Sequence, residues 1–84
     1  MTYTLIWTHA AVAGLIRLRE SDPLLAKTVR GAIASLASDP YPDTSTTLGS
    51  TDQRRLRIGA ARVIYTVSEE KVCVDILTVG RTLA

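Results

Sequence analysis

The apolar residues of this chain change their spacing near its middle, and this change constrains the fold more than any other feature. Between residues 10 and 38 they recur every three or four positions, which is the period of an amphipathic helix. From residue 54 onward they follow the two-residue period and the apolar runs of strands. Asp39-Pro40-Tyr41-Pro42-Asp43 separates the two regions, and neither proline can continue a helix. Helices and strands are thus segregated along the chain, which predicts an α+β fold.

The first region predicts a short strand followed by two packed helices. Residues 3–7 are mostly β-branched or aromatic and are typical of a strand. Helices are expected over about residues 10–19 and from residue 23 to about residue 38, and because almost nothing separates them they should form an antiparallel hairpin. The residues that can cap and begin these helices are Thr8 for the first and Ser21 or Asp22, then Pro23, for the second. The apolar stripes expected in them are Ala11, Leu15 and Leu18 with Val12 and Ile16, and then Leu25, Val29, Ile33, Leu36 and Ala37.

The second region predicts three antiparallel strands in a meander. Residues 43–52 are rich in Thr, Ser, Gly and Asp and are interpreted as an irregular connection. The strands expected after it are residues 54–58, 62–67 and 72–79, with a break at Gly59-Ala60 and a polar turn over residues 68–71. The last strand is almost continuously apolar, which favours a central position in the sheet. We therefore expect a single domain over residues 1–84: an N-terminal strand, a helical hairpin and a three-stranded meander, with the helices packed on one sheet.

Composition excludes several classes of protein. Apolar residues make up 46% of the 84 residues, which suits a packed core rather than a disordered segment. The single cysteine, Cys73, cannot form an internal disulfide and indicates a reducing compartment. No apolar run approaches the roughly 20 residues of a membrane span, and the first residues lack the basic start and apolar stretch of a secretory signal. A cytoplasmic protein without a membrane partner is expected.

A group of arginines stands where the second strand pattern begins. Its members are Arg54, Arg55, Arg57 and Arg62. They fall within nine residues that contain no acid, although the formal net charge of the chain is only +2. Such a cluster produces a local positive potential that suits phosphate groups. The alternative is a solvated strand face on which Arg62 pairs with Asp75 or Glu69 of a neighbouring strand.

Several short motifs occur in an order that is typical of one protein family. They are Asp39-Pro40-Tyr41-Pro42, Leu48-Gly49, Arg55-Leu56-Arg57-Ile58-Gly59-Ala60-Ala61-Arg62-Val63-Ile64-Tyr65 and Ile76-Leu77-Thr78-Val79-Gly80-Arg81. Together with the order of the elements, they resemble the RelE/ParE toxin superfamily of bacterial type II toxin–antitoxin systems over nearly the whole chain. The resemblance implies a compact toxin whose sheet presents a basic concave face, which in the RelE branch receives messenger RNA in the ribosomal decoding site. It also implies a RelB-like helical antitoxin, encoded alongside, that wraps and neutralises this surface.

The resemblance assigns roles to individual arginines. Arg62 matches the strand arginine that contacts the scissile phosphate, and Arg55 lies where the family often has a lysine proposed to transfer protons. Arg57 matches a generally basic position, and Arg81 lies near the family's C-terminal arginine. We therefore expect catalytic roles for Arg55, Arg62 and Arg81, and RNA binding by Arg54 and Arg57.

Two departures from the family pattern bear on the proton transfers. Gly80 meets Arg81 directly, where the family commonly has a His, Lys or similar residue between them. The sequence reaches Thr82-Leu83-Ala84 without the C-terminal tyrosine or histidine of many active relatives. Arginine is always protonated, so it binds phosphate well but cannot ordinarily serve as a base. These features predict an arginine phosphate clamp with slow cleavage, or with strong dependence on the ribosome to align the RNA.

Other candidate residues are interpreted mainly as structural. His9 stands at the start of the first helix, far along the chain from the arginines, and Asp75 lies in the last strand, either facing outward or paired with an arginine. Cys73, Tyr65 and Trp7 lie in apolar strand patterns and are expected in the core. One histidine and one cysteine match no metal-ligand pattern, so neither a metal nor a cofactor is expected.

Three functions follow from the resemblance and stay open. The first is a metal-independent, ribosome-dependent messenger-RNA endoribonuclease that inhibits translation. The second is a ParE-like inhibitor of DNA gyrase, and the third is a weakly toxic, antitoxin-binding module that acts in repression of their own operon. A cognate antitoxin is expected in every case, with an amphipathic helix that docks on the edge of the helical hairpin and the basic rim of the sheet. The ribosome and messenger RNA are partners in the first case, and operator DNA is contacted only through the antitoxin complex.

Overall fold

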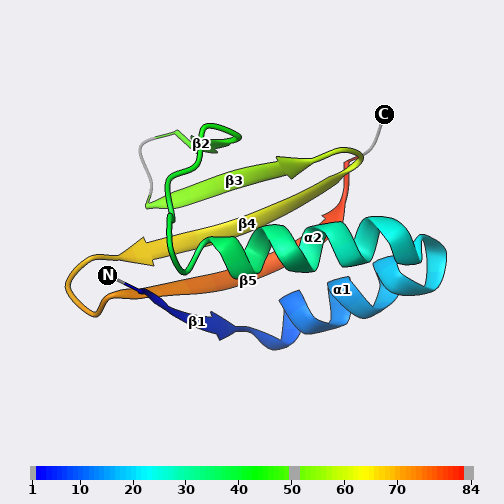
Figure 1. Cartoon of the computed structure of the whole chain (residues 1–84), viewed down its shortest axis with the longest axis horizontal. Helices are drawn as coiled ribbons and strands as arrows, with labels where there is room; N and C mark the ends of the chain where they lie inside the picture. The colour runs from blue at the N-terminus through cyan, green and yellow to red at the C-terminus, as the bar shows by residue number, and fades with distance from the viewer. Residues whose placement is uncertain (1, 50–51, 83–84) are drawn as a thin grey trace.

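Two helices pack on one face of a five-stranded sheet in the computed structural model, which describes residues 2–49 and 52–82 (Figure 1). The elements are β1 (Thr4–Trp7), α1 (His9–Ser21), α2 (Pro23–Ser35), β2 (Ser45–Thr47), β3 (Gln53–Ile58), β4 (Ala61–Ser68) and β5 (Cys73–Arg81). Their order in the sheet is β1-β5-β4-β3-β2, with β1 parallel to β5 and every other pair of neighbours antiparallel. The α+β fold, with both helices on one sheet and the last strand inside it, is confirmed.

Parts of the expected connection and tail lie outside the described residues, namely residues 50 and 51 and Leu83-Ala84. Within the described ranges, neither helix has the length and apolar character needed to cross a membrane.

A single residue, Asp22, both ends α1 and caps α2. Its N–H donates to the Leu18 carbonyl oxygen over 2.7 Å, and its carboxylate Oδ1 accepts from the Leu25 N–H over 3.2 Å. Pro23 occupies the first position of α2, where no intrahelical amide bond is lost. A cap of this kind stabilises a helix by about 1 kcal/mol. The helices are therefore joined without a loop, as the sequence predicts.

Thr8 caps α1 and also ties it to the sheet. Its Oγ1 accepts from the Ala11 N–H over 3.1 Å and lies 2.8 Å from the carbonyl oxygens of Ile76 and Leu77 in β5. The far end of the helical hairpin differs from the expectation, because α2 ends at Ser35 rather than near residue 38. There the Leu36 N–H donates to the Ile33 carbonyl oxygen, a tighter i→i−3 bond that turns the chain towards Pro40.

The sheet contains more than the expected meander. The stretch interpreted as irregular includes β2, which adds to the edge of β3 with Ser45 opposite Leu56 and Thr47 opposite Arg54. Three hydroxyl residues carry no alternating apolar signal, so this strand is defined by its partner's backbone and not by its own pattern. β5 begins at Cys73 because Val72 has a positive φ of 52°, and it extends beyond residue 79 to Arg81, which pairs with Ala61.

The core lies between the sheet and the two helices. Its largest fully buried side chain is Tyr65 of β4, whose hydroxyl donates to the Pro40 carbonyl oxygen over 2.8 Å. The buried residues of α1 are Ala11, Gly14 and Leu18. Gly14 lets the helix backbone approach β5, since an added Cβ would lie 2.0 Å from the Val79 carbonyl oxygen. Val12 and Ile16, which the apolar spacing included in the buried stripe, are instead 44% and 41% exposed.

Candidate functional site

The β3–β4 hairpin sets the register of the arginines. Its two-residue turn is Gly59-Ala60, and Gly59 has a φ of 56°, a conformation that glycine adopts without strain. With Ile58 opposite Ala61, the ladder places Arg57 opposite Arg62 and Arg55 opposite Ile64. Residues opposite one another share a face of the sheet, and alternate residues of a strand do so too. The turn therefore brings Arg55, Arg57 and Arg62 to one face.

This face is the one that the helices leave open. Leu56 and Val63, which alternate with the arginines, are buried against the helices, so Arg55, Arg57 and Arg62 lie on the opposite side. Arg57 and Arg62 are exposed, and Arg55 is half-buried between its register partners Thr46 and Ile64. We call the surface made by Arg55, Arg57 and Arg62 the arginine face.

The charges on the arginine face are uncompensated within the described residues. Arg57 and Arg62 are direct register partners, and like charges in that relation destabilise a sheet. Arg62 faces Gly80 on its other side. The ion pair found within 4.0 Å in the described ranges joins Arg81 to Asp22, so Arg62 forms none with Asp75 or Glu69. A bound anion would relieve the repulsion that these two guanidinium groups exert on each other.

Arg55 carries a buried hydrogen-bond donor on this face. Its Nε is shielded from solvent and has no hydrogen-bond partner among the described residues. A buried donor without an acceptor is costly and rare in folded proteins. A guanidinium group can donate two parallel hydrogen bonds to a phosphate, so Arg55 has the chemistry to bind one.

Arg54 lies on the other side of the sheet, although it is next to Arg55 in the sequence. Its register partner is the buried Tyr65, which places it on the helix side near the edge strand β2. Its Nε and Nη2 donate to the Ser45 Oγ over 3.2 and 2.8 Å, and its guanidinium carbon lies 5.1 Å from the centre of the Tyr41 ring. The structure thus commits Arg54, for which the sequence predicted RNA binding, to local contacts away from the arginine face.

Tyr41 belongs to a cluster that joins three segments on the same side. The hydroxyl groups of Tyr3 and Tyr41 both donate to the Glu69 carboxylate, the former over 2.6 Å. The hydrogen bond to Glu69 raises the pKa of Tyr41 to about 12 and also raises the pKa of Tyr3. The two hydroxyl groups in turn lower the pKa of Glu69. We call Tyr3, Tyr41 and Glu69 the tyrosine clasp.

Arg81 is also separated from the arginine face. It is opposite Ala61, a buried residue on the helix side, and its Nη1 lies 3.9 Å from the Asp22 Oδ2 at the tip of the helical hairpin. Both side chains of this pair are nearly half exposed, so the pair contributes little to stability. Of the three arginines predicted to be catalytic, Arg55 and Arg62 lie on the same face of the sheet, and Arg81 lies on the helix side.

The remaining candidates take the places that their patterns favoured, with one exception. Tyr65 and Cys73 are buried, and His9 is exposed at the first position of α1. Asp75 is half-buried on the open face opposite Thr66, away from the rows that hold Arg57 and Arg62. Trp7 packs against the core only in part. No cluster of three or more His, Cys, Asp or Glu side chains that could hold a metal ion occurs in the described part of the chain.

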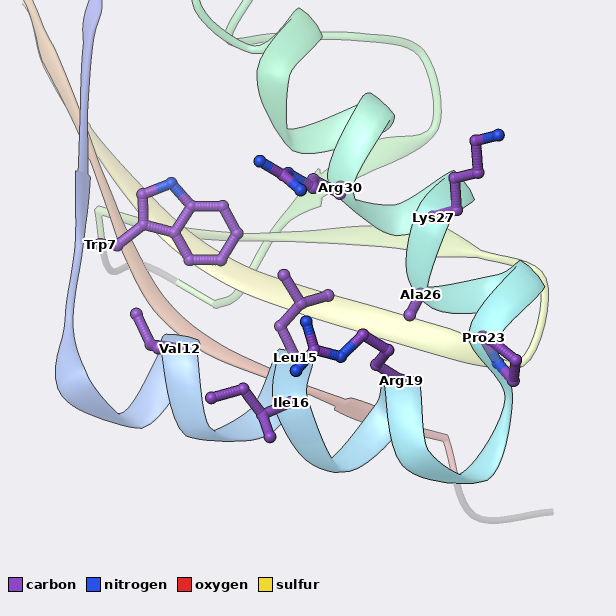
Figure 2. A pocket seen from close by; sticks show the side chains of 9 residues that line it. All are labelled: Trp7, Val12, Leu15, Ile16, Arg19, Pro23, Ala26, Lys27 and Arg30. Atoms are coloured by element: carbon purple, nitrogen blue, oxygen red, sulfur yellow. The ribbon is translucent and has the colours of Figure 1, made fainter.

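A second group of cations borders a groove between the helices, and the sequence analysis did not identify it. The groove has a volume of about 500 Å³. Its apolar walls include Val12 and Ile16 of α1 and Ala26 of α2, with Trp7 at one end, and its basic rim consists of Arg19, Lys27 and Arg30 (Figure 2). We call it the hairpin groove. The signal that could have found it is Gly14, because a glycine at the contact with the sheet turns Val12 and Ile16 outward.

The chemistry available on the arginine face is anion binding and charge stabilisation. Guanidinium groups stay protonated at physiological pH, so they can neutralise a phosphate and the charge that develops on it, but they do not exchange protons with it. In the described residues, neither a histidine nor a carboxylate is a register partner of Arg55, Arg57 or Arg62.

The chain is similar to toxins of known structure over almost its full length. The family described as "ParE toxin of type II toxin-antitoxin system, parDE" matches residues 5–83. A chain of the toxin–antitoxin complex RelBE2 from Mycobacterium tuberculosis is 26% identical, with a TM-score of 0.77 and coverage of 96% of this chain and 99% of the other. The archaeal RelE–RelB complex from Pyrococcus horikoshii OT3 also gives 26% identity, with a TM-score of 0.73 and 96% of both chains covered.

A third structure supports the fold alone. The YoeB/ParE toxin from Agrobacterium tumefaciens has a TM-score of 0.79 over 95% of this chain and 99% of that one, at 14% identity. No curated protein matches this chain significantly in sequence. The family match covers nearly every residue from β1 to the end of β5. The chain therefore belongs to the ParE toxin family of type II toxin–antitoxin systems, within the RelE/ParE superfamily.

Proposed function

We propose that this toxin inhibits translation as a metal-independent endoribonuclease that cuts messenger RNA on the ribosome, with the arginine face bound to the sugar–phosphate backbone. The observation that carries the proposal is the like-charged pair Arg57 and Arg62 beside Arg55, whose Nε has no hydrogen-bond partner among the described residues. Three guanidinium groups on a helix-free face fit successive phosphates of a single strand. The repulsion between their charges destabilises the free protein, and a bound polyanion relieves it.

The proposed roles follow from what arginine can do. In the reaction the 2′-oxygen forms a bond to phosphorus and the bond between phosphorus and the 5′-oxygen breaks, while one proton leaves the 2′-hydroxyl and another reaches the 5′-oxygen. Arg62 holds the scissile phosphate and stabilises its developing charge, and Arg57 and Arg55 bind the phosphates next to it, Arg55 from the half-buried side. The proton transfers are assigned to groups of the ribosome, the RNA or water. Cleavage of free RNA should therefore be slow.

The partners of the proposed toxin are the ribosome, messenger RNA and a cognate antitoxin. The solved structures from Mycobacterium tuberculosis and Pyrococcus horikoshii are both complexes of a toxin with its antitoxin. By similarity, a RelB-like antitoxin neutralises this chain, and operator DNA is contacted only through that complex. The substrate and the one buried, unpaired cysteine of the described residues are consistent with a cytoplasmic protein.

The proposal is tested by replacing Arg62. Arg62→Ala should lower messenger cleavage by about 100-fold, the effect of losing one donor that stabilises transition-state charge. Arg62→Lys keeps the charge but not the planar fork, so its cleavage rate should be intermediate. Cleavage is measured by primer extension on a messenger during translation in vitro. Arg17→Ala, an exposed arginine of α1, is the matched control and should cut normally. Unchanged cleavage by folded Arg62→Ala would rule out this site.

Inhibition of DNA gyrase is the second candidate function. It is favoured by the description of the matched family as ParE toxins, and also because none of the described register partners of the arginine face is a histidine or a carboxylate. A supercoiling assay with purified gyrase separates the two functions. Loss of supercoiling at toxin concentrations that leave messenger RNA intact would replace the nuclease proposal with this one.

A further inference from the structure

Asp75 is an acidic residue on a face of the sheet that is otherwise neutral or basic. Its neighbours in β5, Val74 and Ile76, are buried under the helices, so Asp75 lies on the same open face as the arginines. Of the residues that the structure places in strands, Asp75 alone is acidic. A carboxylate here repels phosphates and weakens the binding of a polyanion, unless the carboxylate contacts a hydrogen-bond donor. Phosphate binding alone therefore does not account for Asp75.

The carboxylate of Asp75 is free to accept hydrogen bonds. It forms neither a hydrogen bond nor an ion pair with any of the described residues, although three arginines lie on the same face. Its oxygen atoms contact solvent, since the buried side-chain polar atom without a partner in the described ranges is the Arg55 Nε. An ionised carboxylate accepts hydrogen bonds and donates none. A ligand that contacts Asp75 must therefore present N–H or O–H groups.

The residues beside Asp75 complete a small recognition surface. Its register partners are Thr66 of β4 and Ile6 of β1. Ile6 is 46% exposed and places an apolar surface next to the carboxylate. The hydroxyl group of the half-buried Thr66 bonds to none of the described residues, so it can donate to a ligand. An acceptor, a donor and an apolar surface in one row suit a flat ring with a hydrogen-bonding edge, such as a nucleobase.

This surface lies one row of register partners away from the arginine face. Arg55, Ile64 and Thr78 form one row across β3, β4 and β5, and the next row on the open face contains Thr66 and Asp75. The two rows are two residues apart, or about 7 Å along a strand, and β3 and β5 lie about 10 Å apart on either side of β4. A nucleotide whose phosphate is bound by Arg55 can span this distance with its sugar and base. The base then reaches Asp75.

Hydrogen-bond chemistry selects which base fits the row. Guanine presents two adjacent donors, N1–H and the N2 amino group, to the two oxygens of a carboxylate, and its O6 beside them can accept from the Thr66 hydroxyl group. Adenine and cytosine place a ring-nitrogen acceptor beside their amino group. Uracil has one N–H group between two carbonyl oxygens. In these three bases an acceptor would face the carboxylate and be repelled, so guanine is favoured.

We propose that Asp75 and Thr66 bind the Watson–Crick edge of a guanine in single-stranded RNA, in the nucleotide whose phosphate contacts Arg55. Ile6 supports the plane of the base. This inference rests on the proposed function, because it takes the arginine face as the site of the RNA backbone. Asp75 takes no part in breaking the bond. It is a specificity-determining residue that selects the sequence beside the cut.

Two RNAs that differ by one amino group test the base contact. The probes are fluorescein-labelled UUGUU and UUIUU, in which inosine is guanosine without the N2 amino group, and 2′-O-methyl groups prevent their cleavage. The full chain should bind UUGUU about tenfold more tightly than UUIUU in an anisotropy titration, because the carboxylate loses one of its two donors. The titration is made at low salt, where the phosphate contacts are strongest. Equal affinity for the two RNAs would overturn the base contact.

Asp75→Asn tests whether the carboxylate is responsible. The amide keeps the shape of the side chain but presents one acceptor and one donor, a pattern that matches adenine and not guanine. The preference for UUGUU over UUIUU should fall below about twofold, and the preference for UUGUU over UUAUU should fall at least about tenfold. Glu70→Gln removes a charge from an exposed turn residue and is the matched control, which should keep both preferences. Thermal melts verify that both variants fold.

Arg62→Ala separates this inference from the proposed function. It should weaken all three RNAs by a similar factor and leave their relative affinities unchanged, because a phosphate contact carries no sequence information. Arg62-dependent binding without a preference for guanine would overturn the base contact and leave the proposed function standing. A preference for guanine, with messenger RNA left intact in the translation assay, would overturn the nuclease proposal and keep the base contact.

The remaining alternative is that Asp75 faces a basic side chain of a protein partner and only repels RNA. In that case Asp75→Asn would raise the affinity for all three RNAs by the same factor, since removal of one negative charge favours every polyanion equally. That uniform rise would overturn the base contact. A change in the order of the three affinities would support it.

Discussion

The arginine face and the hairpin groove are both rich in cations, yet they differ in what surrounds the charge. On the arginine face, Arg57 and Arg62 stand directly opposite each other on two paired strands. In the groove, Arg19 and Arg30 border exposed apolar walls and stand on different helices. The first surface gains from an anion that lies between close guanidinium groups, whereas the second gains from burial of carbon with charge at its edges. The groups that surround the cations, and not the charge alone, therefore decide whether a surface binds phosphate or an acidic helix.

The largest effect is expected from a substitution at Gly14, because both surfaces depend on the contact of α1 with β5. Gly14→Ala would place a methyl group 2.0 Å from the Val79 carbonyl oxygen, and backbone cannot give way as a flexible side chain does. We expect a loss of about 3 kcal/mol or more in the free energy of unfolding, measured by denaturant titration. Gly31→Ala is the control, since nothing lies within 4 Å of a Cβ there. Within α2 it should stabilise the chain by up to about 1 kcal/mol. If Gly14→Ala is as stable as the parent chain, the close approach of α1 to β5 is wrong.

Salt sharpens the comparison between the two surfaces. Three phosphate contacts on single-stranded RNA give a slope of about −2 in log affinity against log salt, or roughly a 20-fold loss between 50 and 200 mM. An acidic peptide in the groove carries no condensed counterions and owes most of its affinity to apolar burial, so its loss should stay below about threefold. Parallel titrations of a short RNA and the acidic peptide measure both slopes. Equal slopes would mean that charge contributes equally to the binding of the RNA and of the peptide, which would contradict the distinction between the two surfaces.

Local chemistry made much of the fold predictable. Thr8, Asp22 and Pro23 encode the helix starts, and Gly59 encodes the hairpin turn that sets the arginine register. These signals act over a few residues, so the sequence displays them directly. β2 and the parallel pairing of β1 with β5 were not predicted. β1 pairs with β5, which is distant in the sequence. β2 has no alternating apolar residues of its own and is positioned by the backbone of β3.

The candidate site was predictable in part for the same reason. Alternation along β3 places Arg55 and Arg57 on one face of the sheet and Arg54 on the other, with the buried Leu56. The separation of Arg54 from the other arginines could therefore have been predicted from the sequence. The separation of Arg81 depends instead on a long-range pairing with Ala61 and on a shift in the β4–β5 register near Ile64. The groove was missed because an apolar periodicity that ignores Gly14 assigns exposed residues to the core.

The smallest expected effect concerns the tyrosine clasp, which lies apart from both cationic surfaces. The pKa of Glu69 is lowered in the folded chain, so its contribution to stability is present above its unfolded pKa and is lost as the pH falls through the folded value. The pKa of Tyr41 is raised to about 12, so its contribution is complete below its unfolded value near 10 and is lost as the pH rises towards 12. Melting temperature measured against pH should therefore decline at both ends.

Glu69→Gln should flatten both ends of that profile, because the amide cannot titrate and is a weaker acceptor for the two hydroxyl groups. Glu70→Gln, the neighbouring exposed residue, is the matched control and should keep the parent profile. The clasp joins the residue before β1, the loop before β2 and the turn before β5 on the helix side of the sheet, well away from Arg57 and Arg62. RNA affinity at neutral pH should consequently be the same in Glu69→Gln as in the parent chain. A change in RNA affinity that follows the clasp would show that the arginine face is not independent of the opposite side of the sheet.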